Sequence, residues 1–433
     1  MSIFASRLVF TLTRICILLM LTVSVQAADV TDRLGRRVLD DGGNHLVYND
    51  ADRPDNTASK YSHQVSPVLN SDPDITEHVN WVWATLGTGI GVGLLDSADL
   101  DGDGDLEVIT TGGGESFGGP NAIFILENNL TDVTCMLEQA GAPLDYHIQQ
   151  LDSDKPLEVL LVTSTEILMI DGASCVIESR SVFPSPIDSG GLGDINHDGV
   201  PDVAYSVGND LYLAPWNDFS NPLERRGFGG SRIIVEPLGR VDGDDIGVAS
   251  NVLFVLRGDS LQTIMEIADP ISPMFDFGDI DGNGEAEVIA GVPWSDGITV
   301  YGVPGGEVLL NVPFFNLATL RAQDFDGDGN SEIVFGEAQW GSVGIIDGDG
   351  TLLKSISNPS HGTTNVLVVD LHADNKQELL WGAGHTDTGS DHLYSGDLQS
   401  ELVSWWSQDI DGPFQLAQPG KYLASSRSQV AVS

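Results

Sequence analysis

The chain is poor in cysteine and in basic residues, and both shortages limit what it can be. Three cysteines in 433 residues are too few for a small scaffold built on disulfides. Lysine and arginine number 19 against 64 aspartates and glutamates, which gives a formal net charge of −45. Because phosphate binding needs basic side chains, this charge argues against nucleic acid as a partner. A hydrophobic fraction of 41% and eight tryptophans nevertheless predict a packed core.

Long apolar runs are also missing, except near the N-terminus. Arg7 and Arg14 precede the apolar run Ile15–Val25, and small residues lead up to Ala27. This pattern predicts a signal peptide over residues 1–27, with an uncleaved N-terminal anchor as the alternative. The run falls short of the roughly 20 residues that span a bilayer, so we expect no transmembrane segment. The chain is therefore predicted to be secreted, held at the cell surface or periplasmic.

An acidic segment recurs along the rest of the chain. Its pattern, D-x-[DN]-x-[DN]-G-x-x-[DE] between short apolar runs, is complete at four loops, which begin at Asp99, Asp194, Asp279 and Asp324. Four incomplete versions begin at Gln150, Arg240, Asp370 and Lys421. The loop at Gln150 keeps acids at its third, fifth and ninth positions, whereas the loop at Arg240 lacks the ninth acid. Together they give a period of about 45 residues, which indicates a repeat architecture.

Each period contains four short runs of β-branched and aromatic residues. They are separated by Gly, Pro, Asp and Asn, as in EVIAGVP, GITVYGV and EVLLNVPF after the loop at Asp279, and helical periodicity is absent. A four-stranded unit of this length is typical of one propeller blade, with a β-solenoid as the alternative. The predicted fold is all-β: a β-propeller of seven to eight four-stranded blades with calcium-binding hairpin loops, over residues 79–433.

The two ends of the chain are expected to meet. Residues 28–78 fit no repeat and read as a polar leader, with one strand at His45–Tyr48, or as a flexible tail. The segment around Val79–Ala84 resembles the one before the eighth loop, so it is predicted to complete the last blade and leave no open edge. The alternative is that the chain continues in a longer natural product.

The complete loops are predicted to bind about four Ca²⁺ ions. In such a turn the side chains at positions 1, 3 and 5 converge, position 7 offers its backbone carbonyl, and the acid at position 9 closes the cage. Six or seven oxygens in a flexible cage suit calcium better than magnesium, and the absence of cysteine ligands argues against zinc. The predicted ligands are Asp99, Asp101, Asp103, Asp105 and Glu107; Asp194, Asn196, Asp198, Val200 and Asp202; Asp279, Asp281, Asn283, Glu285 and Glu287; and Asp324, Asp326, Asp328, Asn330 and Glu332.

These loops and their flanks resemble the FG-GAP and VCBS repeats of integrin α-subunit propellers and of many bacterial secreted proteins. Phe277–Gly278 stands just before the third complete loop, and Ala290–Pro293 (AGVP) follows it, like the two short motifs that name the repeat. The resemblance implies a calcium-binding propeller and protein or carbohydrate ligands. It weakens at the four incomplete loops, where ligands have been lost.

Two classes of function follow. A non-catalytic ligand-binding or adhesion module for an extracellular protein or glycan is favoured, because H-E-x-x-H and P-loop motifs are absent. The alternative is an extracellular polysaccharide-degrading enzyme, such as a lyase, whose chemistry needs a base and a cation. The only dense titratable group outside the loops is His385, Asp387, Asp391 and His392, which also fits a solvated hairpin.

Two cysteines remain after the predicted signal peptide, which contains Cys16. Cys135 and Cys175 each follow a turn at similar points of successive repeats. A bridge between neighbouring repeats and a pair of buried free thiols are both consistent with this spacing.

Overall fold

The computed structural model describes most of the repeat region. The described residues are 95–111, 122–127, 133–138, 141–238, 243–268, 274–291, 297–313, 316–370, 376–383, 391–396 and 403–408, with five short strands nearer the N-terminus. All regular elements of this part of the chain are strands. No helix among the described residues is long and apolar enough to cross a membrane.

Seven antiparallel sheets of four strands follow one another along the chain, each strand paired with the next in sequence. Blade 1 contains β6 (Leu95–Ala98), β7 (Glu107–Thr111), β8 (Ala122–Leu126) and β9 (Val133–Glu138). Blade 2 contains β10 (Pro143–Gln149), β11 (Glu158–Thr163), β12 (Glu166–Asp171) and β13 (Ile177–Val182). Blade 3 contains β14 (Ser189–Gly193), β15 (Asp202–Val207), β16 (Asp210–Pro215) and β17 (Leu223–Arg226). Blade 4 contains β18 (Arg232–Glu236), β19 (Asp245–Ala249), β20 (Leu253–Leu256) and β21 (Thr263–Ile267).

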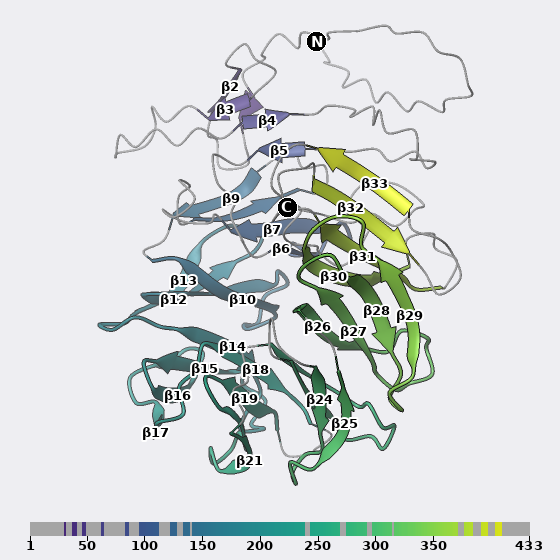
Figure 1. The fold of residues 1–433 in the computed structure, drawn as a ribbon. Coiled ribbons are helices and arrows are strands. Elements are labelled where there is room, and N and C mark those ends of the chain that lie inside the picture. The colour runs from purple at the N-terminus through teal and green to yellow at the C-terminus, as the bar shows by residue number, and fades with distance from the viewer. Residues whose placement is uncertain are drawn as a thin grey trace, which may run out of the picture.

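The remaining three blades have the same order. Blade 5 contains β22 (Phe275–Gly278), β23 (Glu287–Gly291), β24 (Ile298–Tyr301) and β25 (Val308–Val312). Blade 6 contains β26 (Leu317–Gln323), β27 (Glu332–Glu337), β28 (Ser342–Ile346) and β29 (Leu352–Ser357). Blade 7 contains β30 (Thr363–Val369), β31 (Glu378–Ala383), β32 (Asp391–Gly396) and β33 (Val403–Gln408). Figure 1 shows the sheets arranged in sequence order around a central axis, so the fold is a seven-bladed β-propeller.

The core lies between the blades rather than within any one of them. Six clusters of buried apolar side chains each join two successive blades, for example Leu100 and Ile109 of blade 1 with Val159 and Leu161 of blade 2. The second strands are fully buried, as in the run EVLLVT of β11. The fourth strands face solvent on one side, and β13 accordingly alternates in burial.

The two glycines of the FG and AGVP motifs have a packing role. A Cβ at Gly278 would lie 2.5 Å from the Cβ of Ala322, and a Cβ at Gly291 would overlap Leu317. Both neighbours belong to β26 of the next blade. These positions therefore need glycine because two blades approach each other closely there.

The predicted loop register is right in six blades and wrong in one. The fourth loop was predicted to begin at Arg240 and to lack the ninth acid. Instead Asp245 opens β19 and pairs with Glu236, as the ninth acid of each complete loop pairs with the residue before that loop. The loop therefore begins at Pro237, and Asp245 holds the ninth position.

The leader and the ends of the chain are described only in part. The predicted strand at His45–Tyr48 corresponds to β3 (Leu46–Tyr48), which forms a sheet with β2 (Arg37–Asp40) and β1 (Val30–Thr31). β5 (Trp83–Thr85) pairs with β4 (Ser62–Gln64) in a separate sheet. The eighth predicted loop, from Lys421, lies outside the described residues, and ring closure through residues 79–84 stays a prediction.

Candidate metal centres

Each complete acidic loop joins the first strand of a blade to the second, and all four close in the same way. In blade 1 the Gly104 N–H donates to Asp99 Oδ2 at 3.1 Å, and the Asp103 N–H donates to Asp101 Oδ1 at 3.0 Å. The Leu100 N–H donates to Glu107 Oε2 at 2.7 Å. Equivalent bonds hold the loops of blades 5 and 6. In blade 3 the first two bonds recur, and the ninth acid, Asp202, accepts the N–H of the third position, Asn196. The pattern D-x-[DN]-x-[DN]-G therefore specifies closely similar loops in four blades.

The fourth and sixth positions of these loops have left-handed backbone conformations, which explains their glycines. Gly102 and Gly104 have φ of 72° and 95°. In blade 3 the fourth position is His197, with φ of 57°, and its side chain is exposed. The left-handed backbone at the fourth position is thus kept where histidine replaces glycine.

Three of the loops bring carboxylates of the first, third and ninth positions together. One oxygen from each of the three lies within 4.8 Å of the others, in the groups Asp99–Asp101–Glu107, Asp279–Asp281–Glu287 and Asp324–Asp326–Glu332. In blade 3 the third position is Asn196, and the Asn196 N–H donates to Asp202 Oδ2 at 3.3 Å. That loop presents an amide oxygen where the others present a carboxylate.

The predicted ligands at positions 5 and 7 are connected to each other by a hydrogen bond in all four loops. The side chains at position 5 (Asp103, Asp198, Asn283 and Asp328) accept the N–H of position 7 through Oδ1. The side chains at position 7 are exposed at Asp105, Val200 and Glu285. The predicted contribution of position 7 is its backbone carbonyl, which does not depend on the side chain.

The ninth acid of each complete loop is buried, and in blade 1 it has an oxygen without a hydrogen bond. Glu107 is only 3% exposed, and its Oε1, like Oδ1 of Asp99, is buried and accepts no hydrogen bond from the protein. Burial raises the pKa of Glu107 to about 7, and Asp101, Glu127 and Asp103 add repulsion. Burial likewise raises the pKa of Asp202 to about 6. A buried anion of this kind needs a compensating cation.

The donor set fits a hard divalent cation. Every group that converges is a carboxylate, amide or carbonyl oxygen, with no sulfur or imidazole among them. Oxygen ligands in a loop of this flexibility suit Ca²⁺, whereas Mg²⁺ requires a smaller and stricter octahedron. Residues of the first, third and ninth positions would hold the ion, which would neutralise their mutual repulsion.

A disulfide connects the first two blades. Cys135 of β9 and Cys175, in the turn between β12 and β13, are joined across 40 residues of sequence. Both cysteines are buried in the apolar cluster between these blades. Of the two alternatives that the sequence left open, the bridge is the one observed.

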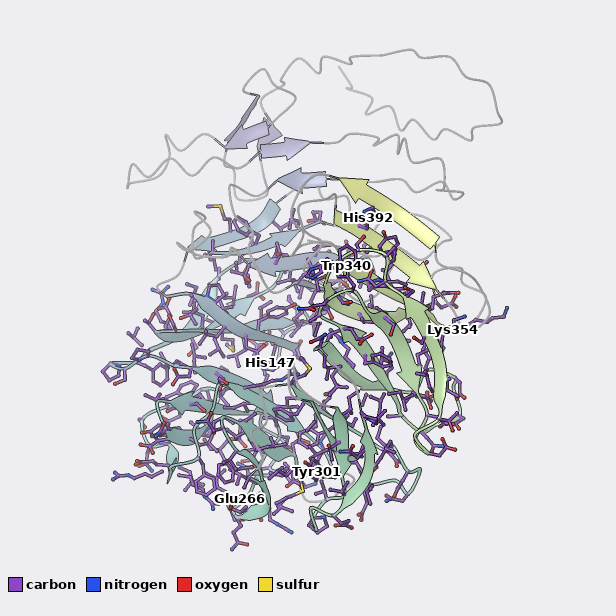
Figure 2. The ribbon with its side chains drawn as sticks, viewed as in Figure 1. His147, Glu266, Tyr301, Trp340, Lys354 and His392 are labelled. Carbon is purple, nitrogen blue, oxygen red and sulfur yellow. A yellow bond between two sulfur atoms is a disulfide. The ribbon has the colours of Figure 1, made fainter. Side chains whose placement is uncertain are left out.

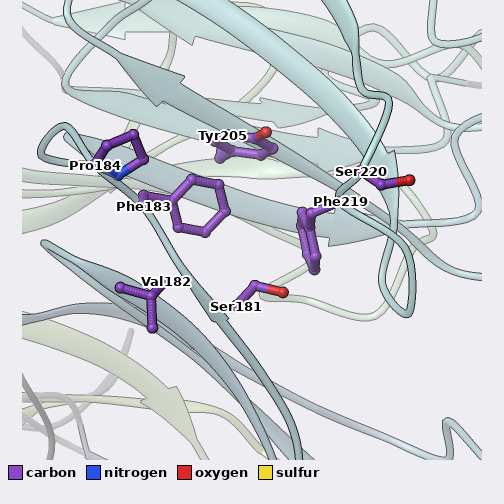
Figure 3. A pocket seen from close by; sticks show the side chains of 7 residues that line it. All are labelled: Ser181, Val182, Phe183, Pro184, Tyr205, Phe219 and Ser220. Atoms are coloured by element: carbon purple, nitrogen blue, oxygen red, sulfur yellow. The ribbon is translucent and has the colours of Figure 1, made fainter.

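An aromatic hollow lies between blades 2 and 3. It has a volume of about 410 Å³ and is lined by Ser181, Val182, Phe183, Pro184, Tyr205, Phe219 and Ser220. Figure 3 shows the rings of Phe183, Tyr205 and Phe219 gathered together, with ring centroids 5.0 to 5.9 Å apart. The lining contains no charged residue. Such a surface favours a neutral ligand with an apolar face.

Charged side chains also meet on the inner strands. Arg321 of β26 donates to Asn365 Oδ1 at 3.1 Å, and Asp276 of β22 accepts the Ala322 N–H at 3.0 Å. Burial raises the pKa of Asp276, and burial next to Asp276 and Asp244 raises that of Glu236 to about 7. The inner strands therefore carry acids whose pKa values are shifted toward neutrality.

No family model and no curated protein matches this sequence. Solved structures match through their architecture. The exotype rhamnogalacturonan lyase YesX has a TM-score of 0.55 at 13% identity, over 78% of this chain and 69% of that one. BBS1N, in a complex with ARL6DN, has a TM-score of 0.50 at 14% identity, over 67% of this chain and 87% of that one. BamB from Moraxella catarrhalis has a TM-score of 0.49 at 13% identity, over 84% and 94%.

The shared feature is the propeller fold. At these identities the likeness says nothing of ligand or activity. The titratable group predicted around His385 and Asp387 lies outside the described residues. His392, labelled in Figure 2, lies on β32 of the propeller, where its ring stacks on Tyr394 with centroids 5.1 Å apart.

Proposed function

We propose that the protein is a secreted, calcium-loaded propeller that acts as a non-catalytic binding or adhesion module for an extracellular protein or glycan. The observation that carries the proposal is the set of buried, unpartnered oxygens at Asp99 and Glu107, within a loop shape that recurs four times. Calcium matches that arrangement because it is a divalent cation that prefers oxygen ligands in a flexible loop.

The ions are structural. Each loop connects two adjacent strands of a blade, and its ninth acid is the first residue of the second strand. An ion held there ties the strand to the loop and cancels repulsion between carboxylates. An ion that binds only the folded chain adds about 2.7 kcal/mol to its stability at a hundredfold excess over Kd.

Secretion is supported by the N-terminal signal pattern and by the disulfide. Bridges such as Cys135–Cys175 persist in oxidising compartments and are rare where thiols are kept reduced. Millimolar calcium is also available outside cells, where sites of modest affinity stay filled.

A neutral glycan is the ligand that the aromatic hollow fits best. Sugar rings present apolar C–H faces that stack on aromatic side chains, and Ser181 and Ser220 offer hydroxyl groups at its edge. A net charge of −45 disfavours polyanionic ligands. Binding at this site needs no catalytic base, in keeping with a binding module.

A glycan array, read with millimolar calcium and again with chelator, tests the proposal. Specific binding to neutral glycans is expected with calcium, with loss in chelator as the fold loosens. Phe219→Ala should weaken that binding about fivefold, because aromatic stacking contributes on the order of 1 kcal/mol. Trp340→Ala, at an exposed aromatic in blade 6, is the matched control and should bind as the wild type does.

The same protein preparation can be assayed for the alternative function, polysaccharide degradation. Turnover of a uronic-acid polysaccharide, with product that absorbs as an unsaturated sugar, would favour the polysaccharide-degrading enzyme. Absence of both turnover and glycan binding would leave a protein ligand, to be sought by cross-linking on cells.

A further inference from the structure

In blade 2, acidic residues from outside the incomplete loop lie close to the acids of that loop. The loop between β10 and β11 brings Asp152, Asp154 and Glu158 together, with one oxygen of each within 4.8 Å of the others. A second group of the same size joins Asp154 to Asp171 and Glu178. Asp171 ends β12 and Glu178 lies on β13, so these ligands come from a different hairpin.

Glu158, a member of the first of these groups, carries a buried oxygen without a hydrogen bond. Glu158 is 0% exposed, and its Oε2 accepts the N–H of Leu151. Its Oε1 is also buried but accepts no hydrogen bond from the protein. This is the condition found at Glu107 in the complete loop of blade 1.

The basic side chains nearest in sequence are engaged elsewhere. Lys155, within the same loop, donates to the carbonyl of Gly102 in blade 1. Arg180 of β13 pairs with Glu166 at 3.5 Å. Neither of these two residues pairs with the acidic group, and the amide of Gln150 donates to the carbonyls of Asp152 and Asp154.

The hairpin is held against the loop by the backbone. The Gly172 N–H donates to the Leu157 carbonyl at 3.0 Å, and a Cβ on Gly172 would lie 2.5 Å from that oxygen. Asp171, 5% exposed, is fixed by accepting the Ser174 N–H. The two acidic segments are thus positioned in advance of any ion.

We propose that blade 2 binds a further divalent cation between its β10–β11 loop and its β12–β13 hairpin, centred on Asp154 and closed by Asp171, Glu178 and Glu158. Gln150 stands where a complete loop has its first aspartate, and the hairpin supplies the missing negative ligands. The all-oxygen donor set selects calcium over softer metals. The site lies outside the four complete loops and does not depend on which ligand the propeller binds.

Calcium stoichiometry tests the site. The protein is dialysed to equilibrium against millimolar calcium, and mass spectrometry of the metal gives the bound calcium as the excess of the protein side over the buffer side. The wild type is expected to hold five ions, and the Asp171→Asn, Glu178→Gln double variant four. The amide introduced at position 171 can still accept the Ser174 N–H, so the hairpin should keep its shape. Glu178→Gln alone, on an exposed strand, should weaken one site about tenfold in a terbium luminescence titration.

The matched control removes two acids from the corresponding hairpin of blade 4. Asp259→Asn with Glu266→Gln changes charge equally at exposed positions and should leave five ions. Asp259 lies in the turn before β21, and Glu266 lies on β21 (Figure 2). If wild type and double variant both hold four ions, the inference is overturned and the four complete loops remain. If Asp326→Ala also leaves the count unchanged, or the wild type holds none, the calcium proposal itself fails.

Discussion

The backbone N–H of Leu157 donates to the carbonyl of Leu100 at 2.8 Å, which joins the acidic loop of blade 2 directly to that of blade 1. The backbone N–H of Asp244 likewise donates to the carbonyl of Asp194 between blades 3 and 4. The backbone N–H of Ser331 donates to the carbonyl of Asp279 between blades 5 and 6. If ions bind as proposed, an ion in one loop would also hold the backbone that anchors the loop of the next blade. Calcium effects on stability are expected to be cooperative between such neighbours rather than independent.

Removing calcium should destabilise the propeller steeply. Chelation leaves several groups of carboxylates facing one another, so the melting temperature should fall, and millimolar calcium should restore it where magnesium at the same concentration does so poorly. Asp326→Ala should reproduce one loop's share, about 2 to 3 kcal/mol in denaturant titrations. Differential scanning fluorimetry and urea unfolding measure both effects.

The control for this experiment is Asp259→Ala, at an exposed turn of blade 4, which should change stability by less than about 0.5 kcal/mol. A melting curve that chelator leaves unchanged, together with loss of a measurable turnover, would make the ions catalytic. The polysaccharide-degrading enzyme would then replace the binding module.

Glu236 should make the folded protein more stable in mild acid. Its folded-state pKa of about 7 lies above the ordinary value of 4.5, so the folded chain keeps the proton that the unfolded chain releases. This contribution is complete below pH 4.5 and is lost as the pH rises through 7. With calcium saturating, the stability of the wild type relative to Glu236→Gln should fall by roughly 1 to 2 kcal/mol between about pH 5 and pH 8.

Urea unfolding at several pH values measures that difference directly. Glu266→Gln, at an exposed acid of β21, is the control and should track the wild type at every pH. Parallel curves for Glu236→Gln and wild type would contradict the assignment of the raised pKa to Glu236.

Loss of the disulfide should weaken the junction between the first two blades. Cys135→Ala with Cys175→Ala is expected to cost about 2 to 4 kcal/mol, because the bridge closes a 40-residue stretch of the unfolded chain. Urea unfolding in calcium, with and without reductant, tests this. Reductant should shift the wild type toward the double variant and leave the double variant where it is; a shift in both would point to a different cause.

Gly258 should tolerate no side chain. A Cβ there would overlap the carbonyl of Asp244 and the side chain of Ile195 in the preceding blade. Gly258→Ala is therefore expected to cost about 1 to 3 kcal/mol through overpacking. Ser260→Ala, exposed in the same turn, should be neutral within about 0.5 kcal/mol, and equal melting temperatures for the two variants would argue against the contact.

The repeat and its complete loops could be predicted from sequence because each loop fixes its own shape through hydrogen bonds only two to seven residues apart. The fourth loop was misplaced for the opposite reason. This loop lacks acids at its first positions, and the residues from Arg240 fit the pattern by chance. Its register follows only from the pairing of Glu236 with Asp245.

Features that depend on contacts between separate segments could not be predicted from the sequence. Asp171 and Glu178 join Asp154 because a separate hairpin packs on the loop, and no linear spacing encodes that. The Cys135–Cys175 bridge was one of two alternatives, since choosing it requires knowing that these turns of neighbouring blades touch.

The same bridge also determines how the propeller would yield to a mechanical load. A pull that reaches β9 passes through the sulfur atoms to the hairpin that follows β12, so tension is shared by blades 1 and 2. Under extension these blades would detach as one unit, and the 40 residues enclosed by the covalent loop would add no length until the bond is reduced. If the protein acts as the proposed adhesion module, the disulfide would reinforce the junction between blades 1 and 2 against force from flow or from a moving cell surface.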